Sequence, residues 1–255
     1  MLPTGDASPV FVVRDLRRAF GDNLVLDGLS FDLAAGECLA VLGRSGSGKS
    51  VLLRQLNGLD KPDAGSIRFH GEEITALTEE ELRPLRRRVA MLFQSGALFD
   101  SMTVLDNVAF PLREHTDLDE AAVRERVLQA LERVGLDDVE ELLPASLSGG
   151  MKKRVALARS LVLAPEVVLY DEPTSGLDPM TSATIGRVIR AVQRQLEVTS
   201  AVVTHDIALA RLVGDRVAFL HAGRFRFLGT WQEADRTDDR LFADFLAGRE
   251  ESHAA

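Results

Sequence analysis

Residues 43–50 read GRSGSGKS, a run of small residues that ends in a lysine and a serine. The run fits the pattern G-x-x-x-x-G-K-[ST], whose backbone N–H groups surround phosphate oxygens while the lysine reaches the β and γ phosphates and the last hydroxyl meets Mg²⁺. Here Lys49 and Ser50 would take these two parts. The alternative is a flexible glycine-rich turn. We expect the phosphate site, because an apolar strand pattern at 39–42 precedes the loop and helical spacing at 49–59 follows it.

The charge of the whole chain opposes an anionic ligand, since 39 acidic and 30 basic residues leave a net charge of -9. Exposed charges beyond about 8 Å are largely screened. A lysine about 4 Å from a phosphate contributes roughly 4 kcal/mol at an effective dielectric of 20. Local geometry therefore outweighs net charge at the loop. The acidic balance counts against a broad nucleic-acid surface, so no nucleic-acid partner is expected.

Residues 167–172 read VVLYDE, a strand pattern that ends in two carboxylates. Nucleotides bind where the strands of an open α/β sheet end, so Asp171 and Glu172 are expected beside the phosphate loop. Asp171 would hold Mg²⁺, directly or through water, and Glu172 would polarise the water that attacks the γ phosphorus. A solvated acidic turn is the alternative interpretation.

A third pattern, LSGGM at 147–151, precedes a helical pattern at 151–164. A serine with two glycines at a helix start indicates either a second anion-binding site, formed by Ser148, Gly149 and Gly150, or an N-cap serine in an ordinary loop. The order of the three patterns along the chain favours the anion-binding site.

Together these motifs resemble the nucleotide-binding cassette of ABC transporters, over residues Val10 to Gly229. The resemblance implies an α/β P-loop NTPase fold with a mixed, mainly parallel core sheet, an antiparallel β subdomain and an α-helical subdomain at about 100–163. It implies a nucleotide-binding domain at 10–229, followed by a short C-terminal helix and tail at 230–255. The cofactors implied are ATP and Mg²⁺.

The family pattern also assigns roles to single residues. Phe20 would stack on adenine, although a phenylalanine beside a strand is usually a core residue. Gln94 resembles the glutamine that senses Mg²⁺, Asp178 the aspartate that reaches the facing cassette, and His205 the histidine that holds the γ phosphate. The implied catalytic residues are Glu172, His205 and Gln94, and the implied metal ligands are Ser50, Gln94 and Asp171. The nucleotide-binding residues implied are Phe20, Gly43, Arg44, Ser45, Gly46, Ser47, Gly48, Lys49, Ser50, Val51, Ser148, Gly149, Gly150 and Asp178.

In this family ATP lies between two cassettes, so the resemblance implies a homodimer in which Lys49 of one copy faces Ser148 of the other. Residues 91–116, together with Met151, are similar to the ATPase subunit of MCE-type lipid transporters (MlaF-like). That likeness implies an integral membrane permease and an MCE-domain lipid-binding protein as partners, and phospholipid or a related lipid as cargo. The alternatives are the ATPase of another transporter, such as a small-molecule importer, and a soluble ABC ATPase without a transport role.

The sequence has no run of 18 apolar residues and no signal-peptide pattern, so we expect a cytoplasmic protein on the cytoplasmic face of the inner membrane. Cys38, the only cysteine, is expected to pack as a small apolar side chain. An amphipathic helix is predicted near the C-terminus. Its apolar face suggests a contact with the other subunit, through Leu241, Phe242, Phe245 and Leu246.

Overall fold

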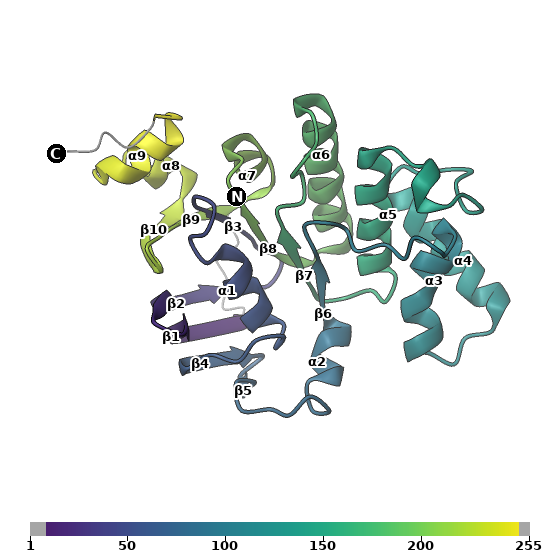
Figure 1. The fold of residues 1–255 in the computed structure, drawn as a ribbon, viewed down its shortest axis with the longest axis horizontal. Coiled ribbons are helices and arrows are strands. Elements are labelled where there is room, and N and C mark those ends of the chain that lie inside the picture. The colour runs from purple at the N-terminus through teal and green to yellow at the C-terminus, as the bar shows by residue number, and fades with distance from the viewer. Residues whose placement is uncertain (1–8, 250–255) are drawn as a thin grey trace.

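The structure is a computed structural model that describes residues 9–249. Its centre is a six-stranded sheet in which the strands lie in the order β10-β9-β3-β8-β7-β6 (Figure 1). All neighbours in this sheet are parallel except β9 and β10, which form an antiparallel pair. The strand bounds are β3 Cys38–Leu42, β6 Val89–Leu92, β7 Val167–Asp171, β8 Thr199–Thr204, β9 Arg216–His221 and β10 Arg224–Thr230.

A second, antiparallel sheet has the order β2-β1-β4-β5. Helix α1 packs against β2 as well as against β7 and β8, so it lies between the two sheets (Figure 1). The loop of residues 43–48 joins the end of β3 to the N-terminus of α1. The bounds are β1 Phe11–Phe20, β2 Asn23–Leu33, α1 Lys49–Leu56, β4 Ala64–Phe69 and β5 Glu72–Glu73.

Strands β3, β7 and β8 of the central sheet are buried on both faces, as expected for parallel strands covered on either side. In β7, Val167 and Leu169 belong to the core shared with α1 and the antiparallel sheet, whereas Val168 and Tyr170 face the core built from the helices of the other side. Because successive side chains of a strand point to opposite faces of the sheet, β7 contributes to two hydrophobic cores. Cys38 is fully buried in the second of these cores, as predicted.

The helices of residues 104–161 form a group at one end of the molecule (Figure 1). Asn107 fixes the loop before them, because its fully buried amide accepts from Phe99 N and donates to the carbonyls of Phe99, Met102 and Thr103. Two further helices, α6 and α7, pack against each other, and α7 contacts β3 and β8. The bounds are α2 Arg83–Arg88, α3 Val104–His115, α4 Glu120–Arg133, η1 Pro144–Ser146, α5 Gly149–Leu161, α6 Pro179–Leu196 and α7 Ile207–Val213.

The predicted C-terminal helix exists as α9 (Arg240–Leu246), preceded by the short α8 (Trp231–Ala234). Its apolar face is partly covered within the chain: Phe242 is fully buried and stacks on Phe219, with the ring centroids 4.8 Å apart, and Leu241, Phe245 and Leu246 are partly buried against the same core. The ring centroid of Phe245 lies 5.0 Å from that of Phe219. The contact of this face with another subunit stays a prediction. Residues 250–255 of the predicted tail lie outside the described residues.

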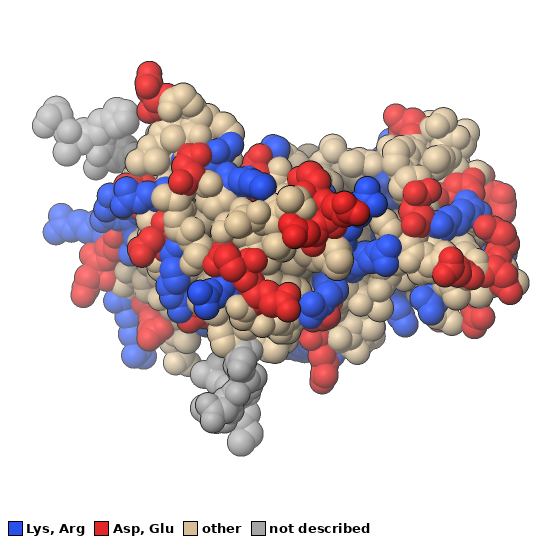
Figure 2. All heavy atoms as spheres, turned by 90° about the horizontal axis from the view of Figure 1, so that it is seen from below, with Lys and Arg blue, Asp and Glu red and all other residues tan. Residues whose placement is uncertain are grey.

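On the face shown in Figure 2, acidic and basic side chains are interspersed, so this face presents no continuous surface of one charge. Across residues 9–249, none of the helices combines the length and apolar character needed to cross a bilayer.

Candidate functional site

The loop after β3 has the backbone geometry of a tight anion-binding turn. Gly46 and Gly48 have φ of +78° and +99°, a region that favours glycine. A Cβ atom at Gly43 would lie 2.6 Å from the Leu220 carbonyl oxygen, and one at Gly48 would lie 2.9 Å from the Val25 carbonyl oxygen. Side chains are therefore excluded from both positions, and the main chain is free to approach a ligand closely.

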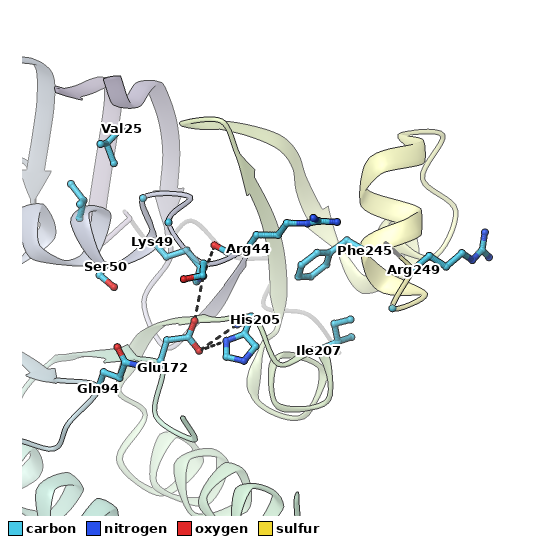
Figure 3. A pocket seen from close by; sticks show the side chains of 15 residues that line it. Val25, Arg44, Lys49, Ser50, Gln94, Glu172, His205, Ile207, Phe245 and Arg249 are labelled. Atoms are coloured by element: carbon cyan, nitrogen blue, oxygen red, sulfur yellow. Dashed lines mark hydrogen bonds and ion pairs between the residues drawn. The ribbon is translucent and has the colours of Figure 1, made fainter. Parts of the chain in front are cut away.

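Lys49 lies almost completely buried at the centre of the site, with 6% of its surface exposed. Its ammonium group donates to the carbonyl oxygens of Gly43 at 2.8 Å and of Arg44 at 3.0 Å. The same Nζ atom lies 3.3 Å from Oε1 of Glu172 (Figure 3). The cation is thus held by its own loop and by the carboxylate of the residue that follows β7, where a phosphate group can replace the carboxylate.

Ser50 and Asp171 meet at the start of α1 and the end of β7. The Ser50 hydroxyl donates to Oδ1 of Asp171 at 2.8 Å. Burial raises the pKa of the Asp171 carboxyl, and the hydrogen bond from Ser50 opposes that shift. A desolvated carboxylate beside a hydroxyl fits a hard divalent cation such as Mg²⁺, which prefers oxygen ligands. Ser50 and Asp171 would hold this ion, with the Gln94 side chain in the same cavity.

Glu172, the residue after β7, has a φ of +45°, a strained conformation for a side chain of its size. Its Oε2 atom lies 2.9 Å from Nδ1 of His205 and accepts a hydrogen bond of 3.2 Å from the Thr204 hydroxyl. Since a carboxylate only accepts, Nδ1 of His205 carries the proton. Figure 3 shows Glu172 between Lys49 and His205. The carboxylate is thus fixed by three groups, in a position to accept a proton from a water molecule.

These side chains surround one cavity of about 680 Å³, a size that suits a nucleotide. The structure brings most of the predicted residues to its wall, namely Arg44, Ser45, Gly46, Gly48, Lys49, Ser50, Val51, Gln94, Glu172 and His205. Three further predicted residues adjoin this wall. Gly43 and Ser47 belong to the same loop as the lining residues, and Asp171 accepts a hydrogen bond from Ser50.

Sequence reasoning missed other lining residues, because they come from segments without a local motif. Val25 of β2 and Ile207 of α7 belong to the wall, as do Phe245, Gly248 and Arg249 at the C-terminal end of α9. The aromatic pattern of α9 was visible in the sequence. Its position beside the phosphate loop depends on packing against β9, which no local signal indicates.

Phe20 ends β1 and is 47% exposed, with the Arg18 guanidinium 4.6 Å from its ring centroid. It does not line the 680 Å³ cavity. Adenine stacking on Phe20 stays a prediction.

Ser148 is the N-cap of α5, where its Oγ atom accepts from Met151 N at 3.3 Å. The two following glycines allow close packing, since a Cβ atom at Gly150 would lie 2.6 Å from the Thr181 methyl carbon. Ser148 and Gly150 line a separate hollow of about 470 Å³, together with residues of α6. Within one chain, these residues therefore do not reach the cavity around Lys49.

Asp178 is the N-cap of α6 and accepts from the backbone N–H groups of Met180 and Thr181, each at 3.0 Å. The hydrogen bond from the Thr181 hydroxyl is the main cause of a lowered pKa of the Asp178 carboxyl. Gln94 donates from Nε2 to the Ser175 hydroxyl at 3.0 Å. The loop that contains Ser175 and Asp178 therefore runs from a side chain bonded to Gln94, at the cavity, to the N-terminus of α6, whose first turn lines the hollow.

Comparisons with known proteins agree with this geometry. A family model described as "ABC transporter" matches residues 26–175. The chain is 41% identical over 237 residues to a probable ribonucleotide transport ATP-binding protein mkl of Mycobacterium leprae, covering 93% of this chain and 68% of that protein. It is 45% identical over 222 residues to a methionine import ATP-binding protein MetN of Rhizobium etli, covering 87% of this chain and only 61% of that protein.

Among solved structures, cbiO1 of Clostridium perfringens, part of the ABC transporter complex cbiONQ, matches with a TM-score of 0.82 and 33% identity. This match covers 94% of this chain and 92% of the other. The ATP-binding cassette MJ0796, solved as a dimer in a post-hydrolysis state bound to ADP and Pi, matches with a TM-score of 0.79 and 30% identity, over 86% of this chain and 98% of the other.

Proposed function

This chain belongs to the ABC transporter family, and from that premise we propose that it binds and hydrolyses ATP to drive a membrane permease from the cytoplasmic face of the membrane. One observation carries the proposal: Lys49, Ser50, Glu172 and His205 line a single cavity of nucleotide size, with Asp171 bonded to Ser50. We also propose the division of the chain into a nucleotide-binding domain at 10–229, with a helical part at about 100–163, and a C-terminal segment at 230–255.

In this mechanism the loop N–H groups and Lys49 hold the β and γ phosphates, and the phosphate displaces the Glu172 carboxylate from Lys49. Glu172 then accepts a proton from the attacking water, because its carboxylate is fixed beside the cavity by His205 and Thr204. His205, with Nδ1 held by Glu172, would contact the γ phosphate. Mg²⁺, when bound at Ser50, Gln94 and Asp171, would neutralise charge on the phosphates.

We propose that the active form is a homodimer in which Ser148, Gly149 and Gly150 of one copy close the cavity of the other. The placement of Ser148 supports this, since it lines the α6 hollow instead of the Lys49 cavity of its own chain. Asp178 and Phe20 keep their proposed roles at the facing cassette and at the adenine. In this arrangement the γ phosphate favours the closed form, and its hydrolysis releases it.

We further propose that the transported substrate is phospholipid or a related lipid, with an MCE-domain protein as a third component. The support is the similarity of residues 91–116 to MlaF-like ATPases, together with Met151 in the signature motif. The main alternative, a small-molecule importer, has support of its own, because the relatives at 41% and 45% identity are named for ribonucleotide transport and methionine import.

The ATPase proposal is tested by Lys49→Ala, which should lose ATP binding measured by calorimetry while it keeps the thermal unfolding midpoint within a few degrees. Wild-type affinity in this variant would contradict the proposal.

The cargo is tested by purifying the tagged chain from detergent-solubilised membranes with its permease and reconstituting the complex in vesicles. Stimulation of ATPase activity by added phospholipid supports the lipid proposal, and stimulation by methionine or a ribonucleotide instead supports the importer alternative.

A further inference from the structure

One face of α5 holds the segment that follows β6. Lys153 donates from Nζ to the carbonyl oxygen of Gln94, and Arg159 donates to the carbonyl oxygens of Gly96 at 2.7 Å and Ala97 at 2.9 Å. Lys153 and Arg159 are six residues apart, and Ala156 lies three residues from each, so the three residues follow one another along one side of the helix. The two cations of α5 therefore bind three carbonyl groups within four consecutive residues of the loop.

The packing between these contacts is close. A Cβ atom at Gly96 would lie 3.3 Å from the Cβ atom of Ala156, which occupies α5 midway between Lys153 and Arg159. Gly96 and Ala97 both have positive φ, +76° and +48°, so the loop turns sharply where α5 holds it. The loop and the helix thus form one unit.

Lys153 is the unusual member of this contact. Only 8% of its surface is exposed, and among the described residues the Gln94 carbonyl is its one hydrogen-bond acceptor. Burial lowers the pKa of the Lys153 ammonium group, and the charges of Asp171 and Glu172 oppose that shift. Burying an ammonium group is costly unless it is bonded, and an apolar residue of similar length would fill the same space without that cost. Packing alone therefore does not account for a lysine at this position.

We propose that Lys153 is a positioning residue for ATP hydrolysis, which holds the main chain of Gln94 so that the Gln94 amide stays at the cavity. The proposal rests on the proposed function. The geometry agrees with it, because the Gln94 side chain lines the cavity and donates to the Ser175 hydroxyl while its carbonyl is bound by Lys153. Because Lys153 binds the main-chain carbonyl and Ser175 accepts from the amide nitrogen, the side-chain oxygen of Gln94 stays available for the nucleotide site.

The same contact joins the two halves of the proposed composite site. Ser148 is the N-cap of α5, and Lys153 lies five residues further along, about 1.4 turns at about 3.6 residues per turn. A displacement of α5, when Ser148 meets nucleotide in the partner, is transmitted through Lys153 to the Gln94 main chain of its own cavity. Lys153 would thereby link closure at one site to the geometry of the other.

The test is Lys153→Met in the full-length protein, with Lys152→Met as the matched control. Lys152 is the neighbouring lysine of α5, and its side chain makes no hydrogen bond or ion pair within residues 9–249. We expect kcat for ATP to fall roughly tenfold in Lys153→Met while the dissociation constant for ATP changes by less than about twofold. Its thermal midpoint should be unchanged or higher, since a buried charge is replaced by an apolar chain. Lys153→Arg should recover most of the rate, and the control should behave as wild type.

A double-mutant cycle with Gln94→Ala separates positioning from a purely structural role. If Lys153 acts through Gln94, then Lys153→Met should cause little further loss of kcat in the Gln94→Ala background. Losses that multiply in the double variant would overturn the proposal, as would a wild-type kcat in Lys153→Met. Failure of the ATPase proposal is distinguishable, because in that case the wild-type protein itself would not hydrolyse ATP.

Discussion

Replacing Glu172 by glutamine removes one charge from the site and leaves its shape nearly unchanged. The carboxylate lies 3.3 Å from Nζ of Lys49, so the gross attraction between them is about 5 kcal/mol at an effective dielectric of 20. Desolvation offsets most of this attraction. Because Lys49 keeps the carbonyl oxygens of Gly43 and Arg44 as acceptors, we expect the free energy of unfolding of the nucleotide-free protein to fall by only about 1–3 kcal/mol.

ATP binding should respond in the opposite direction. In the wild-type protein the γ phosphate must displace the Glu172 carboxylate from Lys49 and then remain beside that negative charge. Glutamine removes both costs, so Glu172→Gln should bind ATP up to about tenfold more tightly, a difference of about 1.4 kcal/mol. Hydrolysis should slow by roughly 10²- to 10⁴-fold, because the variant lacks the general base.

The assay combines calorimetric titration with ATP in Mg²⁺ and single-turnover release of phosphate. Glu132→Gln, on an exposed position of α4, makes the same substitution away from the cavity and is the matched control. Phosphate release at the wild-type rate would remove Glu172 from catalysis. Weaker ATP binding than wild type would refute the competition between carboxylate and phosphate for Lys49.

Two further predictions concern the elements that support the site. Gly150→Ala should destabilise the protein by about 1–3 kcal/mol, because its Cβ atom would lie 2.6 Å from the Thr181 methyl carbon, and Thr181→Ser should restore most of that stability since the hydroxyl bond to Asp178 remains. Thermal unfolding of the single and double variants measures this, and equal losses with and without Thr181→Ser would show that the methyl group is not the obstacle. Asp215→Asn should cost about 1–3 kcal/mol at pH 7, because the Asp215 carboxylate accepts from Arg190 at 2.8 Å. Although burial opposes it, the bond from Arg190 and its companions lowers the pKa of Asp215, so this stabilisation is present above the pKa of about 3.9 of an unfolded aspartate and is lost as the pH falls below it. Denaturant unfolding of both proteins between pH 7 and pH 3 should therefore show the difference shrinking in acid, and a difference that grows in acid would contradict the assignment.

Local patterns predicted the parts of the site that neighbouring residues build. The phosphate loop and the carboxylate pair follow from spacing alone, and the rule that ligands bind where parallel strands end was enough to bring Lys49 and Asp171 together. The predicted fold class is confirmed by the match to cbiO1, and the ABC family assignment by the family model.

Those local patterns could not predict contacts between segments that lie far apart in the sequence. The bond from Lys153 to Gln94 spans 59 residues, and the wall formed by Phe245 and Arg249 arises from the docking of α9 on β9. Both depend on how side chains fill space in the folded core, which a local period does not encode. The same limit applies to the predicted contact between α9 and another subunit. An apolar helix face predicts burial, but it does not indicate which surface covers that face.

The central claim is that each active site is shared between two copies of the chain, and mixing two inactive variants tests it most directly. Lys49→Ala disables the phosphate loop, whereas Ser148→Arg blocks the signature end of α5, and each variant alone should have almost no ATPase activity. In a mixed dimer one site carries both defects and the other carries neither. Equal amounts of the two proteins are mixed under native conditions until their dimers have exchanged subunits. Random pairing makes about half of the dimers mixed, and each mixed dimer has one intact site of two, so about a quarter of the wild-type rate per chain should return. A mixture that stays as inactive as its components, with mixed dimers shown by differential tags, would contradict the shared site.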